Sequence, residues 1–105
     1  MDGWIKIAGK KSLGPGRSMR VSLDGEDVAI FRQGNEFFAV SNVCPHQHFA
    51  RIYEGRLGDR TVTCPMHGWT FDLRTGACLH ESGHLRTFEL KEEGDDLFVR
   101  GRTEG

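Results

Sequence analysis

The sequence predicts an all-β fold: a sandwich-like or barrel-like base of antiparallel strands that carries a small subdomain formed by two loops. Two observations support this prediction. No stretch of the chain shows the 3.6-residue apolar period of an amphipathic helix. Short apolar runs are instead separated by turn signals, and the chain contains 14 glycines. The length of 105 residues fits a single domain that covers residues 1–105.

The base is predicted from three strands joined by tight turns. Apolar side chains alternate with polar ones over residues 19–23, which is typical of a half-buried strand. Asp24-Gly25 is a hairpin signal, and an apolar run at residues 28–31 follows it. The turn at residues 33–35 then leads to another apolar run at residues 37–40. We therefore expect an antiparallel meander.

Further strand candidates lie on either side of this meander. They are residues 4–7, which would form an edge strand, and residues 50–53, 61–63, 69–72, 78–79, 85–91 and 97–99. Residues 43 to about 72 are expected to form the smaller subdomain, because they contain two short motifs rich in cysteine and histidine.

Each of the two motifs offers one thiolate and one imidazole. They are Cys44-Pro45-His46 and Cys64-Pro65-Met66-His67, and residues 47–63 separate them. Each proline fixes a backbone dihedral and removes an N–H donor, which stiffens its turn. Gly68 lets the chain leave the second motif through conformations that other residues avoid. We therefore predict two turns that hold a metal centre between them.

The pattern C-x-H followed by C-x-x-H resembles the ligand set of a Rieske [2Fe–2S] centre, in which two cysteines hold one iron and two histidines hold the other. The likeness continues through Gly-Trp-Thr-Phe-Asp-Leu-Arg-Thr-Gly at residues 68–76. This resemblance implies a Rieske-type β fold with one cluster per chain. It also implies that Cys44 and Cys64 hold the buried iron, whereas His46 and His67 hold the outer iron.

Other interpretations stay open beside this one. A Cys₂His₂ set can bind structural zinc, although zinc modules usually place their two cysteines together and their two histidines together. A structural or redox-sensing metal module is therefore an alternative, and its zinc form would be colourless. The small subunit of an assimilatory nitrite reductase is a nearer alternative, because it has a similar fold. Many such subunits lack the cluster ligands, whereas this chain has all of them.

The resemblance also indicates a branch of the family. Respiratory Rieske proteins carry a disulfide between the ligand loops, but the matching residues here are Phe49 and Met66. Respiratory proteins also place hydroxyl donors where this chain has Trp69 and Phe71. Hydrogen bonds to the cluster sulfurs raise the potential, so their absence favours a low-potential ferredoxin. No second iron site is evident, which makes an electron carrier more plausible than an enzyme.

The ferredoxin branch implies two transient protein partners. A flavin-containing NAD(P)H-dependent reductase would supply the electron, and a terminal, ring-hydroxylating oxygenase would accept it. The net charge of −1 gives no argument for nucleic acid as a partner. No apolar run is long enough to span a membrane, and the expected location is cytoplasmic.

The remaining cysteine and histidines have no assigned role. Cys78 is expected to be a small packed residue, and His48 an exposed loop residue. His80 and His84 lie in a predicted loop near the cluster.

Overall fold

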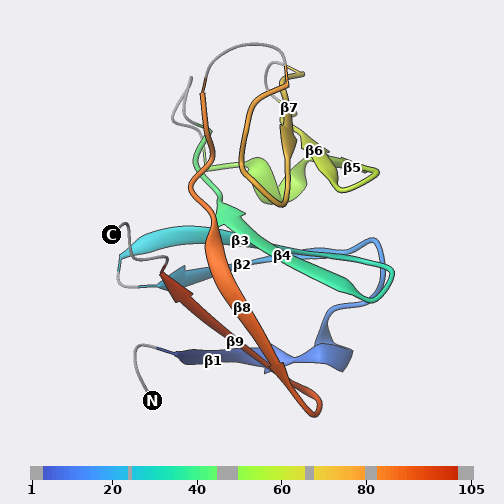
Figure 1. The fold of residues 1–105 in the computed structure, drawn as a ribbon, viewed down its shortest axis with the longest axis vertical. Helices are drawn as coiled ribbons and strands as arrows, with labels where there is room; N and C mark the ends of the chain where they lie inside the picture. The colour runs from blue at the N-terminus through green and yellow to red at the C-terminus, as the bar shows by residue number, and fades with distance from the viewer. Residues whose placement is uncertain (1–3, 24, 45–49, 66–67, 80–82, 102–105) are drawn as a thin grey trace.

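The strands form three antiparallel sheets (Figure 1). The computed structural model describes residues 4–23, 25–44, 50–65, 68–79 and 83–101. Its strands are β1 Ile5–Gly9, β2 Ser18–Leu23, β3 Glu26–Gln33, β4 Glu36–Ser41, β5 Arg56–Gly58, β6 Thr61–Thr63, β7 Thr70–Asp72, β8 Phe88–Glu93 and β9 Asp96–Gly101. Two short 3₁₀ helices, η1 Lys10–Ser12 and η2 Ile52–Glu54, lie between strands. The predicted all-β class is confirmed.

One sheet is the predicted meander, in the order β2-β3-β4. Leu23 pairs with Glu26 across the first turn, and Gln33 pairs with Glu36 across the second. Gly34 in the second turn has φ 61°, a left-handed conformation that glycine adopts without steric cost. Both turns therefore connect neighbouring paired strands, as the predicted meander requires.

A second sheet, in the order β1-β9-β8, joins the two ends of the described chain. β1 lies at the edge of this sheet, as predicted for residues 4–7, and Ile5 pairs with Val99. A register shift interrupts the pairing between Lys6 and Ala8. The two sheets meet where Val40 bridges Thr87 and the Ser41 amide donates to the Arg86 carbonyl at 2.7 Å.

The central strand β3 packs its two faces into two different cores. Residues 28–31 are fully buried, and successive side chains of a strand point to opposite faces. Val28 and Ile30 belong to one core, which also contains Phe88 and Val99 from the second sheet. The neighbouring side chains on β3 belong to the other core. That core contains Ala29, Phe31, Phe38, Val40, Cys44, Ile52, Val62, Cys64, Phe71, Leu73 and Leu85.

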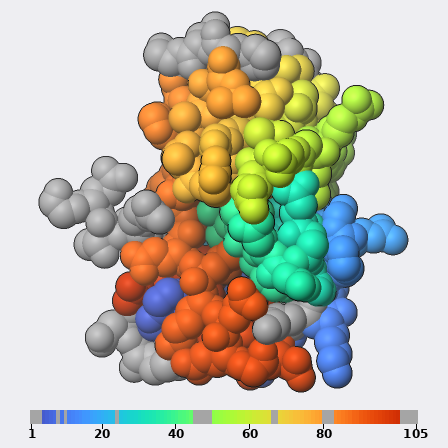
Figure 2. All heavy atoms as spheres, turned by 45° about the vertical axis from the view of Figure 1, so that its right-hand side comes forward, coloured from blue at the N-terminus to red at the C-terminus, as the bar shows by residue number. Residues whose placement is uncertain are grey.

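The third sheet, in the order β5-β6-β7, lies at one end of the molecule, whereas the β8–β9 turn lies at the opposite end (Figure 1). Figure 2 shows residues 50–65 and 68–79 gathered at the same end as this sheet. Val62 on β6 pairs with Leu57 on β5 and with Phe71 on β7. No helix among the described residues is long and apolar enough to cross a membrane.

Two of the predicted strands are wrong. Residues 50–53 contain the start of η2 instead, because the Ile52 amide and the Tyr53 amide both donate to Asn42 and not to a neighbouring strand. Residues 78–79 contribute only an isolated bridge, in which Cys78 pairs with Phe71.

Candidate metal centre

The thiols of Cys44 and Cys64 come from segments far apart in the sequence and share one core. Cys44 is 0% exposed and Cys64 is 1% exposed. Both belong to the core formed with β3, β4, β6 and β7. None of the three cysteines forms a disulfide. Two buried thiols that enter one core from different loops fit a centre in which cysteines hold the inner iron.

The first predicted ligand segment, residues 43–50, follows the end of β4, and its two end residues pair with each other. Val43, directly before Cys44, bridges Ala50, so residues 43 and 50 lie side by side. Asn42, which directly precedes this segment, is 0% exposed and bonds to Ala50 at its far end and to Ile52 and Tyr53 just beyond it. Cys44 therefore starts from a fixed point on the sheet.

The second predicted ligand segment, residues 64–69, connects β6 and β7. The Cys64 amide donates to the Trp69 carbonyl at 2.7 Å, and the Gly68 amide donates to the Cys64 carbonyl at 2.9 Å. Gly68 has φ 73°, which agrees with the expectation that this position needs glycine. At the base of the turn, the hydroxyl oxygens of Thr63 and Thr70 are 2.9 Å apart and share a hydrogen bond.

The described residues contain only half of the predicted ligand set. His46 and His67 lie outside the described residues, as do His48, Phe49, Met66 and His80. Within the described residues, no group of three or more potential metal ligands gathers. His84 is exposed and bridges Ala77, while Cys78 is partly buried and packs against the core that contains the other two cysteines. The packed position predicted for Cys78 is therefore confirmed.

Two aromatic residues, Trp69 and Phe71, contribute to the core that contains Cys44 and Cys64. They occupy the positions at which the sequence comparison expected hydroxyl donors in respiratory Rieske proteins. Phe71 is fully buried in the core that contains Cys44 and Cys64, and Trp69 packs against that core. These side chains make the surroundings of the thiols apolar. The donor set and its apolar surroundings together fit a [2Fe–2S] cluster with few side-chain hydrogen bonds to its sulfurs.

The turn after β7 is held by a carboxylate. The Asp72 side chain accepts hydrogen bonds from the Arg74 amide at 2.7 Å and from the Thr75 amide at 3.3 Å. Desolvation by burial opposes ionisation of Asp72. These two amides and the Arg74 guanidinium outweigh it and hold the pKa of Asp72 below its ordinary value.

We expect Asp72→Asn to lower the free energy of unfolding at pH 7 by about 1 kcal/mol, because a neutral amide is a weaker acceptor. The pKa of Asp72 is lowered in the folded state, so its ionised form stabilises the protein above about pH 4. This contribution is lost as the pH falls through the folded pKa. Urea unfolding between pH 7 and pH 3.5 should therefore show a smaller acid-dependent loss in the variant.

The control for this prediction is Asp59→Asn, because the Asp59 side chain is 94% exposed. It should change the free energy of unfolding very little at either pH. Equal acid sensitivity in Asp72→Asn and the wild type would contradict the assigned role of Asp72.

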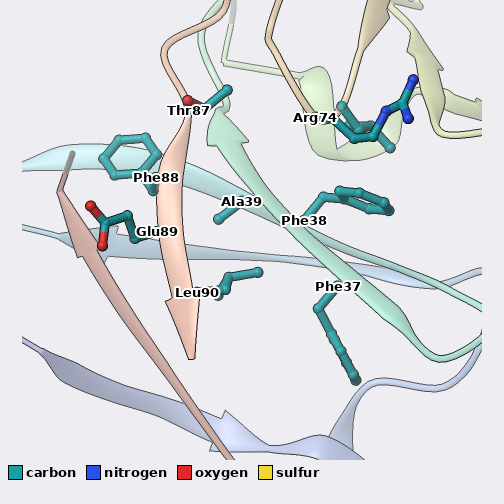
Figure 3. A pocket seen from close by; sticks show the side chains of 9 residues that line it. Phe37, Phe38, Ala39, Arg74, Thr87, Phe88, Glu89 and Leu90 are labelled. Atoms are coloured by element: carbon teal, nitrogen blue, oxygen red, sulfur yellow. The ribbon is translucent and has the colours of Figure 1, made fainter. Parts of the chain in front are cut away.

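A separate cavity of about 380 Å³ opens between β4 and β8 (Figure 3). Side chains from both strands line it, together with Arg74 from the turn after β7. Neither Cys44 nor Cys64 borders this cavity. It is therefore distinct from the candidate metal centre.

Sequence reasoning did not single out Asn42, which is buried at the end of β4 and bonds to residues 50–53. Its signal was weak, because an asparagine at the end of a strand is common and its partner Asp27 lies on a different strand.

Comparison with known proteins assigns this arrangement to a family. The profile of the Rieske [2Fe-2S] domain matches residues 3–90. The ferredoxin component of biphenyl 2,3-dioxygenase from Rhodococcus jostii (strain RHA1) is 38% identical over 96 residues. This alignment covers 90% of this chain and 89% of that protein.

Solved structures agree with this assignment. The ferredoxin of carbazole 1,9a-dioxygenase from Nocardioides aromaticivorans IC177 superposes with a TM-score of 0.88 at 27% identity, covering 96% of this chain and 100% of that chain. A ferredoxin chain from a complex of reduced oxygenase and oxidized ferredoxin in carbazole 1,9a-dioxygenase also has a TM-score of 0.88 at 27% identity. That match covers 99% of this chain and 98% of the other.

A structure described as the NADH-dependent nitrite reductase small subunit from Mycobacterium tuberculosis is nearly as similar. It has a TM-score of 0.87 at 28% identity, covering 97% of this chain and 96% of that chain. The fold alone therefore does not separate the two kinds of protein, whereas the relative from Rhodococcus jostii is the ferredoxin component of a dioxygenase. The chain belongs to the Rieske [2Fe–2S] ferredoxins of bacterial aromatic dioxygenase systems, which are electron carriers and not catalytic subunits.

Proposed function

We propose that this chain carries one electron at a time on a single [2Fe–2S] cluster held by Cys44, His46, Cys64 and His67. The observation that carries this proposal is the burial of Cys44 and Cys64 in one core, each directly before a segment that contains a histidine. When bound, the cluster supplies reversible one-electron chemistry. Residues 43 to about 72 would form the cluster-binding subdomain within a single domain.

The protein's own contribution is to hold the cluster and to limit its contact with water. The thiols enter from the buried side, so the histidine side would face outward and provide the route for the electron. Trp69 and Phe71 would keep water away from the cluster sulfurs on the inner side.

A direct test is the metal and sulfide content of the purified protein. We expect about two irons and two acid-labile sulfides per chain, with a coloured visible spectrum. Zinc without iron in a colourless protein would overturn the proposal.

The electron would come from a flavin-containing NAD(P)H-dependent reductase and pass to a ring-hydroxylating oxygenase. The relatives support the oxygenase, because they are dioxygenase ferredoxins and one related ferredoxin was solved in complex with its oxygenase. The absence of disulfides agrees with a reducing compartment such as the cytoplasm. Stopped-flow reduction by candidate reductases, followed by reoxidation with the oxygenase, tests both partners.

The nitrite reductase small subunit remains a second candidate, because one such chain superposes almost equally well. Reoxidation of the reduced protein by a nitrite reductase large subunit, but by no aromatic oxygenase, would favour this function.

We expect a reduction potential near the low end of the Rieske range, around −150 mV. Phe71 is fully buried beside the cysteines and has no hydroxyl to donate to a sulfur ligand. Phe71→Tyr adds one donor at this place and should raise the potential, which redox titration followed by EPR measures. A wild-type potential above about +100 mV would contradict this reasoning, since that end of the range needs strong hydrogen-bond donors.

A further inference from the structure

Asn42 is the buried polar residue at the point where β4 ends and the first ligand segment begins. It is 0% exposed, although asparagine is usually found at the surface. A buried amide is tolerated only where its donors and acceptors find partners. The partners of Asn42 therefore indicate what the residue does.

The side chain of Asn42 bonds to three residues, one on β3 and two within residues 50–53. Its Nδ2 donates to the Ala50 carbonyl at 3.0 Å and to Asp27 Oδ2 on β3 at 3.2 Å. Its Oδ1 accepts from the Tyr53 amide in η2 at 2.7 Å. The amide orientation is fixed chemically, because a carbonyl can only accept and a backbone N–H can only donate.

The backbone of Asn42 contributes two more bonds. Its N–H donates to the Asp27 carbonyl at 2.8 Å, and its carbonyl accepts from the Ile52 amide at 3.1 Å. Asn42 therefore binds β3 on one side and residues 50–53 on the other. The segment between these anchor points contains Cys44 and His46.

Asp27 is itself held in place from the surface. Arg20 on β2 donates to its carboxylate through Nε at 3.3 Å and through Nη2 at 2.6 Å. The same guanidinium lies over the Tyr53 ring, 5.4 Å from its centroid. The chain of contacts therefore runs from Arg20 through Asp27 and Asn42 to both ends of the first ligand segment.

We propose that Asn42, oriented by Asp27, is the positioning residue that fixes Cys44, at the start of the first ligand motif, relative to residues 50–53. This inference rests on the proposed ligand set. A segment held at both ends keeps its ligands in place, and a released segment lets them separate from the iron. The role of Asn42 is thus to slow loss of the cluster and to fix its geometry.

The test compares Asn42→Ala with Val99→Ala in the purified, cluster-containing protein. Val99 is equally buried but belongs to the other core, so its truncation destabilises the fold without touching the ligand segment. We expect Asn42→Ala to release iron to a chelator at least tenfold faster than the wild type and to shift the EPR g values. Val99→Ala should leave the g values unchanged and release iron at nearly the wild-type rate below its unfolding temperature.

Amide hydrogen exchange supplies a readout that does not need the cluster. In Asn42→Ala, the Tyr53 amide loses its acceptor and should exchange at least tenfold faster, while amides of β9 keep their wild-type rates. If the wild type contains no cluster, the proposed function fails, but fast Tyr53 exchange would still show that Asn42 holds the segment. Unchanged exchange, or equal iron release in both variants, would overturn the role of Asn42.

A double substitution guards against simple misfolding. Asn42→Asp removes the donor to Asp27 and to the Ala50 carbonyl and places a carboxylate against both, whereas adding Asp27→Asn restores a donor in the first of these contacts only. We expect the single variant to lose iron rapidly and the double variant to recover part of the wild-type retention. No recovery in a folded double variant would show that the contact between residues 42 and 27 is not sufficient to position the segment, and the part assigned to Asp27 would be wrong.

Discussion

Cys64→Ala is expected to abolish the cluster, so that the iron content falls from about two per chain to nearly none. Cys64 is the buried cysteine of the second predicted ligand motif, and its backbone is fixed by bonds to Trp69 and Gly68. Alanine has no donor atom, and no other described cysteine lies in that turn. Iron analysis, sulfide analysis and the visible spectrum of the purified variant measure the loss. His67→Ala should give the same result, because His67 is the other proposed ligand of the same motif.

The matched control is Cys78→Ser. Cys78 packs against the same core but is only partly buried and lies beyond β7. This variant should keep its iron and its spectrum, as should His48→Ala. If Cys78→Ser loses iron as completely as Cys64→Ala, the loss reflects general damage to the core and not removal of a ligand.

Gly76→Ala is expected to lower the free energy of unfolding by about 3 kcal/mol or more, and the melting temperature by roughly 15 °C. Gly76 has φ 81°, and a Cβ atom at this position would lie 2.0 Å from the Leu85 carbonyl oxygen. That oxygen belongs to the backbone, so it cannot rotate away as a side chain could. The Leu85 amide also donates to the Gly76 carbonyl at 2.7 Å, which holds the two segments together.

The variant Gly34→Ala measures the cost of a positive φ without a steric clash, so its comparison with Gly76→Ala isolates the effect of the clash. Gly34 also has a positive φ, 61°, but a Cβ atom there would meet nothing within 4 Å. We expect a loss of only about 1–2 kcal/mol in this variant. Thermal and urea unfolding of both variants give the comparison. Equal losses would mean that the chain relaxes around Gly76 more easily than its backbone contacts suggest.

Local patterns in the sequence were sufficient to predict the meander formed by β2, β3 and β4. The alternation over residues 19–23 and the turn signals at Asp24-Gly25 and residues 33–35 predicted the order and the antiparallel pairing of these strands. The paired motifs were likewise sufficient to identify the family. In the meander the determining residues lie within a few positions of one another, and in each motif the cysteine lies only two or three positions from its histidine.

Long-range contacts could not be predicted in this way. Residues 50–53 have the apolar character of a strand, but bonds to Asn42 turn them into the start of η2. The pairing of β1 with β9 joins the two ends of the described chain, and no local pattern specifies it. The role of Asn42 depends on Asp27, which lies on another strand. These features are set by tertiary structure and not by local preference.

The two-sided packing of β3 bears on protein engineering. A designer who wished to transplant the ligand segments onto another scaffold could not move residues 43–79 alone. The core that contains Cys44 and Cys64 also includes Ala29 and Phe31 on β3 and Phe38 and Val40 on β4. A graft without these strands would expose to water the apolar side chains that share their core, such as Val62 and Phe71, and would remove part of the core around the cysteines. The smallest portable unit therefore begins at β3, and its opposite face would need a new partner in place of Phe88 and Val99.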